Sequence, residues 1–264
     1  MKETVHGLWI GKLGDIQQLS IRSFLKIGHP YHLWVYDLPK NIPKGTIIRD
    51  ANEIFPKNMV FKHWSGNLAT FADMFRYKLL YKYGGWWVDL DLVCLKPLPS
   101  HIKYFFGGER AKKTGAFKRP QPHTFWIGLM KFPKNDPILK VMYTDMTTKK
   151  KDFQIKSKKL QFNYGQTQLG KLLQDKYGDH FLYTQNKISV DLFNPLSYFD
   201  MIDFFYPKET KKCCKRWGWE EMNVDEIIQR SYTVHLYNKI ILELSEKRGM
   251  ESYLIKYLNN IVNN

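Results

Sequence analysis

The spacing of hydrophobic and polar positions predicts an α/β domain whose first elements are a strand, a helix and a second strand. Residues 4–10 form a short apolar run before a turn bounded by glycines, a pattern typical of a buried strand. Asp15 is a favourable N-cap for a helix that we expect to end near Lys26. Residues 32–36 are aromatic and branched, so we expect the second strand there. This order of elements is typical of the start of a parallel sheet.

The most regular helical pattern covers residues 67–83. Its apolar side chains recur at the spacing of one helical face, at Leu68, Phe71, Ala72, Phe75, Leu79 and Leu80. We expect Gly84 to end this helix in the left-handed conformation. The apolar run 86–93 follows, and we predict a single strand on which Asp89 and Asp91 share one face.

The second half of the chain carries weaker patterns. We expect two strands and two helices there, at 104–107, 125–129, 137–147 and 166–176. From Val224 onward, strand and helix signals are mixed. No repeat or linker marks a boundary, so we expect one domain that covers residues 1–264.

The chain is strongly basic. Lysine and arginine total 41 against 25 aspartate and glutamate residues, a formal net charge of +16. Such a field attracts polyanions, phosphorylated substrates and anionic lipid head groups, although it also serves plain solubility. Many of the cations gather in the runs 149–151, 156–159 and 208–216. None of these runs has the form of a basic recognition helix, and no zinc-finger spacing is present, so nucleic acid is the weaker alternative.

Cysteine content and hydropathy bear on the compartment. The three cysteines, Cys94 and the adjacent Cys213 and Cys214, form neither a disulfide framework nor a paired zinc motif, which indicates a reducing compartment. The N-terminal residues lack the apolar core of a signal peptide, and no run reaches the roughly 18 apolar residues needed to span a bilayer. We therefore expect a soluble cytoplasmic protein that is at most peripherally bound to a membrane surface.

Two acidic residues carry the main chemical signal. Asp89 and Asp91 lie in an otherwise apolar run, and a buried carboxylate costs on the order of several kcal/mol unless it is paired. Their oxygens suit a hard cation such as Mg²⁺ or Mn²⁺, and ligands of open α/β sheets bind beyond the carboxyl ends of the strands. Taken alone, the pair is equally consistent with two solvated acids at a strand end.

Asp73 and Arg76 on the preceding helix add to this signal. They are three residues apart and share a helical face, where an exposed ion pair contributes less than about 1 kcal/mol. Because this helix is apolar over most of its circumference, we expect the pair to be partly buried or to face a ligand. Arginine can bind a phosphate or sugar oxygen bidentately, and aspartate can accept hydrogen bonds from two sugar hydroxyls.

The run from Ala69 to Asp91 resembles the DXD-containing sugar-binding region of retaining glycosyltransferases. The matching elements are Asp73, Arg76-Tyr77, Tyr83-Gly84-Gly85, Trp86-Trp87 and Asp89-Leu90-Asp91. This family includes initiating α-1,6-mannosyltransferases, α-1,4-galactosyl- and N-acetylglucosaminyltransferases, bacterial capsule enzymes and the catalytic domains of clostridial glucosylating toxins. Three shorter segments are also similar to family motifs, Leu8 to Gly11, Tyr164 to Thr167 and Val234 to Asn238. The family's C-terminal Ser-Trp is replaced by Lys239-Ile240, which leaves open how the site closes over the donor phosphates.

The resemblance implies a GT-A fold, which is an α/β fold with a Rossmann-like mixed sheet flanked by helices and a helical or irregular acceptor-side lobe. Residues 1–110 would bind the nucleotide-sugar donor, and residues 111–264 would form the acceptor side with a C-terminal closing segment. The implied reaction moves a hexose, with retention of configuration, from a nucleotide-sugar to a glycan or lipid-linked glycan. A UDP-sugar is the favoured donor and GDP-mannose the alternative, and Mn²⁺ or Mg²⁺ is the implied cofactor.

The resemblance also assigns roles to individual residues. The implied catalytic residues are Asp73, Arg76, Asp89 and Asp91. The implied metal ligands are Asp89, Asp91 and His235. The implied donor-binding residues are Trp9, which would flank the base, together with Asp73, Arg76, Trp87, Asp89, His235 and Asn238.

Three functional classes stay open. The first is a transferase that builds a surface polysaccharide, a lipooligosaccharide or a glycoprotein glycan. The second is an effector that glycosylates a protein with the same core, and the third is a non-enzymatic basic protein that binds membrane or nucleic acid. The segment 211–219 combines cations with two tryptophans, so we expect it to dock on an anionic membrane or to line the acceptor cleft.

Overall fold

A six-stranded mixed sheet forms the centre of the molecule. The computed structural model describes residues 2–108, 125–158, 160, 164–184, 192–195, 224–249 and 252–263. The strand order is β3-β2-β1-β4-β7-β6, in which the first four strands of this order are parallel and β7 and β6 are each antiparallel to their neighbours. The strands are β1 (Val5–Trp9), β2 (Tyr31–Val35), β3 (Ile47–Asp50), β4 (Gly85–Val88), β6 (Phe105–Gly108) and β7 (Phe125–Phe132).

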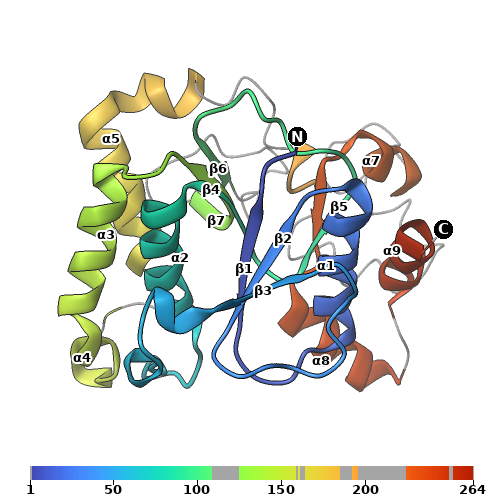
Figure 1. Cartoon of the computed structure of the whole chain (residues 1–264), viewed down its shortest axis with the longest axis horizontal. Helices are drawn as coiled ribbons and strands as arrows, with labels where there is room; N and C mark the ends of the chain where they lie inside the picture. The colour runs from blue at the N-terminus through green and yellow to red at the C-terminus, as the bar shows by residue number, and fades with distance from the viewer. Residues whose placement is uncertain are drawn as a thin grey trace.

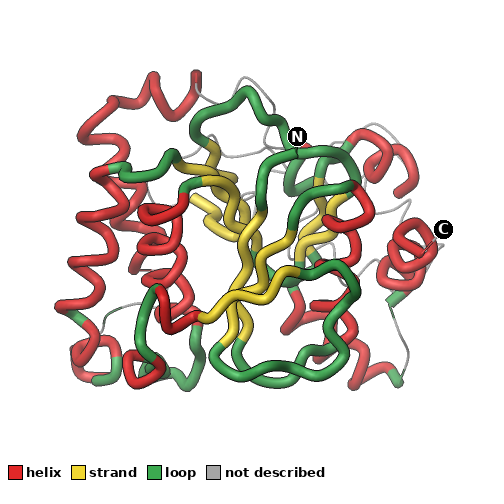
Figure 2. The backbone as a smooth tube through the Cα atoms, viewed as in Figure 1, coloured by secondary structure: helices red, strands yellow, loops and turns green. Residues whose placement is uncertain are grey.

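Helices cover both faces of this sheet. Figure 1 shows α2 (Ala69–Tyr83), α3 (Pro137–Thr148) and α5 (Tyr164–Thr184) on one side, and α1 (Asp15–Ile27) and α9 (Tyr253–Asn263) on the other. The strands lie between these two groups of helices (Figure 2). The predicted α/β fold with a mixed sheet flanked by helices is therefore confirmed. The remaining helical segments are η1 (Ala51–Glu53), η2 (Lys57–Met59), α4 (Lys150–Phe153), η3 (Lys156–Lys158), α7 (Val224–Arg230) and α8 (Asn238–Arg248).

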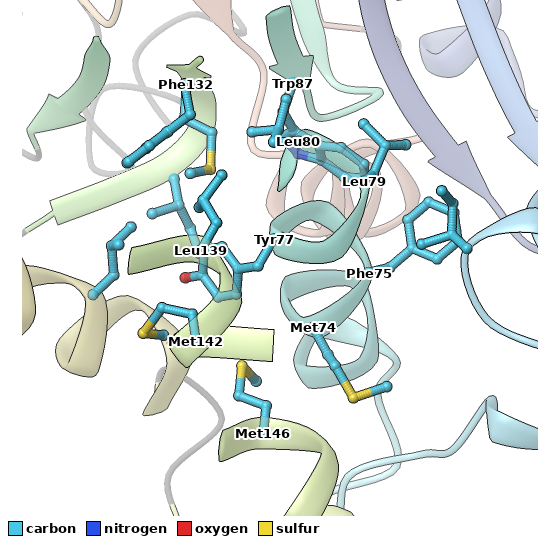
Figure 3. Close-up of a cluster of buried hydrophobic side chains, with 14 of the residues drawn as sticks. Met74, Phe75, Tyr77, Leu79, Leu80, Trp87, Phe132, Leu139, Met142 and Met146 are labelled. Carbon is cyan, nitrogen blue, oxygen red and sulfur yellow. The ribbon is translucent and has the colours of Figure 1, made fainter. Parts of the chain in front are cut away.

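Helix α2 is the centre of the larger hydrophobic core. It is buried on nearly every side because it packs against both the sheet and α3; in Figure 3, Tyr77 points toward Leu139 of α3, whereas Phe75 and Leu79 lie on the other side of the helix. Each large apolar side chain that is fully buried in this way contributes about 1.5–3 kcal/mol to folding. The predicted helix 67–83 is confirmed, and it begins two residues later than expected.

The predicted single strand over residues 86–93 is wrong. Strand β4 ends at Val88, and the chain then turns, since the backbone N–H of Leu92 donates to the carbonyl of Asp89 (3.2 Å). The next residues leave the main sheet and form β5 (Leu92–Cys94), which pairs with β8 (Thr233–His235) in a separate two-stranded sheet. Asp89 and Asp91 therefore lie on a turn at the carboxyl end of β4 and do not share the face of a strand.

Gly84 joins α2 to β4 in a conformation that differs from the expected one. Its φ of 69° is positive as predicted, but its ψ of −164° lies outside the left-handed helical region. A Cβ at this position would lie 2.7 Å from the backbone nitrogen of Lys134. Glycine is required here both for the positive φ and for the close approach of the loop that follows β7.

We expect Gly84→Ala to destabilise the fold by about 2 kcal/mol or more, because it combines a positive φ with a clash against backbone. Gly66→Ala is the matched control, since Gly66 also has a positive φ (89°) but a Cβ there would meet no atom within 4 Å. The control should cost only about 1 kcal/mol. Urea unfolding of the two variants measures the difference, and equal losses would contradict the steric argument.

Candidate active site

The candidate active site lies at the carboxyl ends of the parallel strands, around the turn Asp89-Leu90-Asp91. The middle residue fixes this turn: Leu90 is buried, and a Cβ added to Gly7 of β1 would lie 2.6 Å from its Cδ1 atom. The N–H of Asp89 donates to the carbonyl of Gly128 on β7 (2.7 Å). The turn is thus held by an apolar side chain on one side and by the sheet on the other, which leaves the two carboxylates to face the site.

Arg76 of α2 binds two carboxylates at once. Its Nη2 atom lies 3.2 Å from Oδ1 of Asp73 and 3.2 Å from Oδ1 of Asp89. Its Nη1 atom donates to the carbonyl of Ile127 (2.5 Å), and the guanidinium lies 4.8 Å from the ring centre of Trp87. The predicted pair of Asp73 and Arg76 is therefore a buried ion pair that also reaches the DXD turn.

Burial and charge set the protonation of the three acids. Burial raises the pKa of Asp73 to about 7, against the lowering effect of Arg76 and with a further raising effect of Asp89. Burial also raises the pKa of Asp89, while Arg76 lowers it. The pKa of Asp91 shifts the other way: burial raises it, but His235 and the N–H of Asn238 outweigh this effect and lower it. Asp91 is accordingly the carboxylate held most firmly in its ionised form.

The C-terminal segment completes the site around Asp91. Strand β8 pairs with β5 so that His235 lies opposite Leu92, and the Nε2 atom of His235 is 3.2 Å from Oδ2 of Asp91. The first residue of α8, Asn238, donates its backbone N–H to the same carboxylate oxygen (3.1 Å). The structure therefore brings residues separated by more than 140 positions in the chain into one cluster with the DXD turn.

Two aromatic residues that the sequence did not single out hold His235 in place. The rings of Trp126 and Tyr237 lie 5.0 and 4.0 Å from the His235 ring, centre to centre. Tyr237 has a left-handed backbone (φ 48°, ψ 57°), which costs about 1–2 kcal/mol for a residue with a Cβ and is common at functional sites. The sequence signals for Trp126 are Gly107 and Gly128, since a Cβ at these positions would lie 2.4 and 2.7 Å from the indole.

The two tryptophans predicted to bind the donor occupy different environments. Trp87 is fully buried beneath Arg76, and its indole N–H donates to Oδ1 of Asp89 (2.8 Å). Trp9 lies at the carboxyl end of β1, the same edge of the sheet, and is partly exposed; its indole N–H donates to the carbonyl of Lys12 (2.9 Å). Trp87 therefore orients a carboxylate of the DXD turn, and Trp9 is open to a ligand at the rim.

The donor atoms around Asp91 fit a hard divalent cation. Within the described ranges no three His, Cys, Asp or Glu side chains already stand together as a metal cluster. However, the side chains of Asp89 and Asp91 keep 32% and 19% of their surface exposed, and the Oδ1 atom of Asn238 is buried without a hydrogen-bond partner among the described residues. Carboxylate and amide oxygens are the ligands that Mg²⁺ and Mn²⁺ prefer, with imidazole as an accepted addition.

Arg76→Met should lower the free energy of unfolding by about 3–5 kcal/mol, because it leaves Asp73 and Asp89 buried without their cation. The double variant Asp73→Asn/Arg76→Met should recover part of this loss. Lys57→Met is the control, since it removes an exposed ion pair with Asp37 and should cost less than about 1 kcal/mol. Chemical unfolding measures all three, and a loss for Arg76→Met no larger than the control's would contradict the buried bridge.

The match to a known family covers this site. Residues 20–106, about a third of the chain, match the family described as the glycosyltransferase sugar-binding region containing the DXD motif. The DXD motif at Asp89 to Asp91 lies inside the match, as do Asp73 and Arg76. The predicted enzyme class is confirmed: the chain is a glycosyltransferase, and it carries the DXD sugar-binding region of this family. This excludes the non-enzymatic alternative, and it implies a divalent metal, a sugar donor and an acceptor.

Solved structures with a similar chain path include two glycosyltransferases. The PaToxG glycosyltransferase is 14% identical with a TM-score of 0.44, over 90% of this chain and 86% of that one. The apo form of the glycosyltransferase GlyE from Streptococcus pneumoniae TIGR4 is 14% identical with a TM-score of 0.49, over 89% of this chain and 55% of that one. The chain thus spans about half the length of GlyE. No curated protein sequence matches the chain.

Two features of the chain bear on contact with a membrane. Among the helices of the described segments, none has the length and hydropathy to cross a bilayer. The segment 211–219, predicted to dock on a membrane or to line the acceptor cleft, lies outside the described residues.

Proposed function

We propose that this enzyme transfers a hexose from a nucleotide-sugar to a hydroxyl of a glycan, with the help of a divalent cation. The observation that carries the proposal is the arrangement of Arg76, buried between Asp73 and Asp89, directly beside an ionised Asp91 that His235 and Asn238 hold from the opposite side. Asp73, Arg76 and Asp89 suit the sugar, and Asp91 with its partners His235 and Asn238 suits a metal-bound diphosphate. A UDP-sugar is the favoured donor, and GDP-mannose is the alternative.

Different residues of the site would contact different parts of the donor. Asp73 and Asp89 accept hydrogen bonds from sugar and ribose hydroxyls, since each has carboxylate lone pairs in addition to those that Arg76 binds. Arg76 keeps both acids in place and contributes positive charge where the leaving group becomes more negative. Trp9, at the rim of the same sheet edge, is suited to flank the base.

Asp89, Asp91, His235 and the side-chain oxygen of Asn238 would hold the cation, Mn²⁺ or Mg²⁺. When bound, such a cation neutralises charge on the departing diphosphate as a Lewis acid. Helix α8 begins at Asn238, so the positive end of its dipole is directed toward the same region and favours phosphate there. The residues that follow Asn238 are therefore the first turn of a helix, which takes the place of the family's Ser-Trp segment in the proposed closure over the donor.

The two halves of the chain have different proposed roles within one domain, residues 1–264. Residues 1–110 supply the sugar-binding acids and the DXD turn, and residues 111–264 supply the acceptor side and the segment that completes the metal site. The proposed acceptor is a glycan or lipid-linked glycan of a surface polysaccharide, a lipooligosaccharide or a glycoprotein. A protein acceptor, as for an effector, is the alternative that an acceptor panel would reveal.

Donor and metal binding can be tested together by thermal unfolding with a panel of nucleotide-sugars, with and without Mn²⁺. We expect one nucleotide-sugar to raise the Tm of the wild type only when Mn²⁺ is present, because a ligand that binds the native state stabilises it by mass action. Asp91→Asn should abolish this rise. Asp37→Asn is the matched control, since Asp37 is an exposed aspartate paired with Lys57, and it should behave as the wild type. A rise that persists in Asp91→Asn would show that the DXD turn does not bind the metal.

We further propose that transfer retains the anomeric configuration. Both acids nearest the sugar are bound by Arg76, and this arrangement favours hydroxyl binding over nucleophilic attack. The acceptor hydroxyl would then attack from the face that the diphosphate leaves, and a leaving phosphate oxygen would take its proton. NMR of the product should show the anomer of the donor sugar. The opposite anomer would overturn retention and leave the transferase assignment intact.

A further inference from the structure

A second pocket lies at the opposite edge of the sheet from the DXD turn. It has a volume of about 900 Å³ and is bounded by residues at the amino ends of β1, β2 and β4, among them Lys2, His6, His32, Tyr83 and Gly85. These three strands are parallel, so their amino ends are far from the carboxyl ends at which Asp89 lies. The sugar-binding site makes no use of this pocket.

Three adjacent strands bring basic side chains together here: His6 and His32 line the pocket, and Arg49 lies beside Tyr83, which also lines it. His6 on β1 is in register with His32 on β2, and their rings lie 5.2 Å apart in an edge-to-face arrangement. Arg49 on β3 is in register with Trp34, and its guanidinium lies 5.4 Å from the Trp34 ring and 5.9 Å from the Tyr83 ring. The result is a layer of two imidazoles and one guanidinium supported by aromatic rings.

This basic layer has no counter-charge of its own. The Nδ1 atom of His32 and the Nε atom of Arg49 are buried and have no hydrogen-bond partner within the part of the chain that the structure describes. Buried polar groups are nearly always hydrogen-bonded, and leaving one unsatisfied costs about 1–3 kcal/mol, or more when it is charged. Two such groups on neighbouring strands beside one pocket therefore call for a ligand.

The acidic residues near the pocket, Glu3 and Glu53, already form hydrogen bonds and ion pairs with other residues. Glu3 accepts hydrogen bonds from Lys131 (2.5 Å) and from the indole N–H of Trp86 (2.9 Å), both through Oε2. Glu53 accepts from the hydroxyl of Tyr83 (2.7 Å) and lies 3.9 Å from Lys82. The other charged group at the pocket is cationic: Lys2 donates to the carbonyl of Ile27.

This environment lowers the pKa of both histidines. Burial, then His32 and Arg49, lower the pKa of His6 to about 3, and burial and Arg49 lower the pKa of His32. Both imidazoles are therefore neutral at pH 7 in the free protein. The indole N–H of Trp34 donates to Nδ1 of His6 (3.2 Å), which leaves the ring proton on Nε2, near Gly85 at the pocket. His6 thus presents a donor to the pocket and not a metal-binding lone pair.

We infer that this pocket binds a small molecule through an oxyanion, a phosphate or carboxylate group, held by His32 and His6, which line the pocket, and attracted by the positive charge of Arg49 next to them. Such a group supplies acceptors for the unpaired N–H groups and the missing negative charge. Its volume admits a molecule larger than the anionic group alone. The site is independent of the sugar-binding site and of the reaction proposed for it.

Isothermal titration calorimetry with inorganic phosphate and, separately, citrate tests this site in buffer that contains EDTA. We expect saturable one-site binding of at least one of these anions, and the stronger of the two identifies the class of oxyanion. Arg49→Gln and His32→Gln should each weaken binding about tenfold or more, because each removes one charged or donor group from a buried contact. Unchanged far-UV circular dichroism and Tm without ligand would show that these variants fold.

Two controls separate this pocket from other anion sites. Arg22→Gln changes an arginine on α1 whose Nε is also buried without a partner, and it should leave binding unchanged. Asp91→Asn changes the DXD turn and should also leave binding unchanged. The absence of saturable binding of either anion up to about 10 mM, or binding that Arg49→Gln does not weaken, would overturn the inference.

The pH dependence tests the role of the histidines. A bound anion raises the pKa of His32 from its lowered value, so binding takes up protons and the affinity should rise as pH falls from 8 to 6, whereas His6, with a pKa of about 3, stays neutral and donates from Nε2. The other charged groups near the two imidazoles are Lys2, Arg49, Lys82, Lys131, Glu3 and Glu53. Repeating the titration in two buffers of different ionisation enthalpy measures the proton uptake. An affinity that does not change with pH would show that His32 does not hold the anion.

Discussion

The guanidinium of Arg76 is the contact on which the rest of the site depends. It projects from a helix that is buried on nearly all sides and binds one carboxylate on that helix and another on the turn after β4. A cation in this environment is stable only because both acids and a backbone carbonyl surround it, and the acids stay buried only because the cation is present. The three charges therefore fix the position of α2 relative to the DXD turn, and the two acids keep their geometry in the free protein.

A second set of contacts fixes the other carboxylate of the motif. Leu90 is packed over Gly7, so the turn cannot rotate, and Asp91 is directed toward β8 and α8. His235 is held by Trp126 and by Tyr237, whose left-handed backbone brings the first N–H of α8 onto Asp91. The two acids of one short motif thus have opposite surroundings: Asp89 faces a fixed cation, and Asp91 faces an imidazole and a helix terminus that can share it with a metal.

The sequence was sufficient for most of the first half of the fold. The helices around Asp15 and Asn67 and the first two strands follow directly from periodicity, and they occur within one or two residues of the predicted bounds. The strand predicted over 86–93 failed because the apolar run continues through the turn at Leu90, whose side chain is buried in a different direction, and periodicity cannot distinguish these cases. Strand β3 was missed because Ile47 and Ile48 are half-exposed on an edge strand and have no alternating pattern.

For the site, the sequence identified the acids and the polar residues that bind them, but not the aromatic residues that hold His235. Asp73, Arg76, Asp89, Asp91, His235 and Asn238 were singled out by motif, and the structure brings them together. Trp126 and Tyr237 were missed because their importance lies in a ring contact and a backbone angle, and neither leaves a pattern in one sequence. The anion pocket was missed for a related reason: His6, His32 and Arg49 are far apart in the chain, and only the parallel register places them side by side.

The pairing of β5 with β8 has a consequence for the order in which the protein folds. Asp91 and Asn238 are 147 positions apart, and contacts of such separation form late because a long loop must close first. Asp73 on α2 and Asp89 on the turn after β4 are close in sequence and can assemble early, whereas the half of the candidate site next to Asp91 is complete only when the C-terminal segment has docked. Until then Asp73, Arg76 and Asp89 can be in place while Asp91 lacks its contacts with His235 and Asn238.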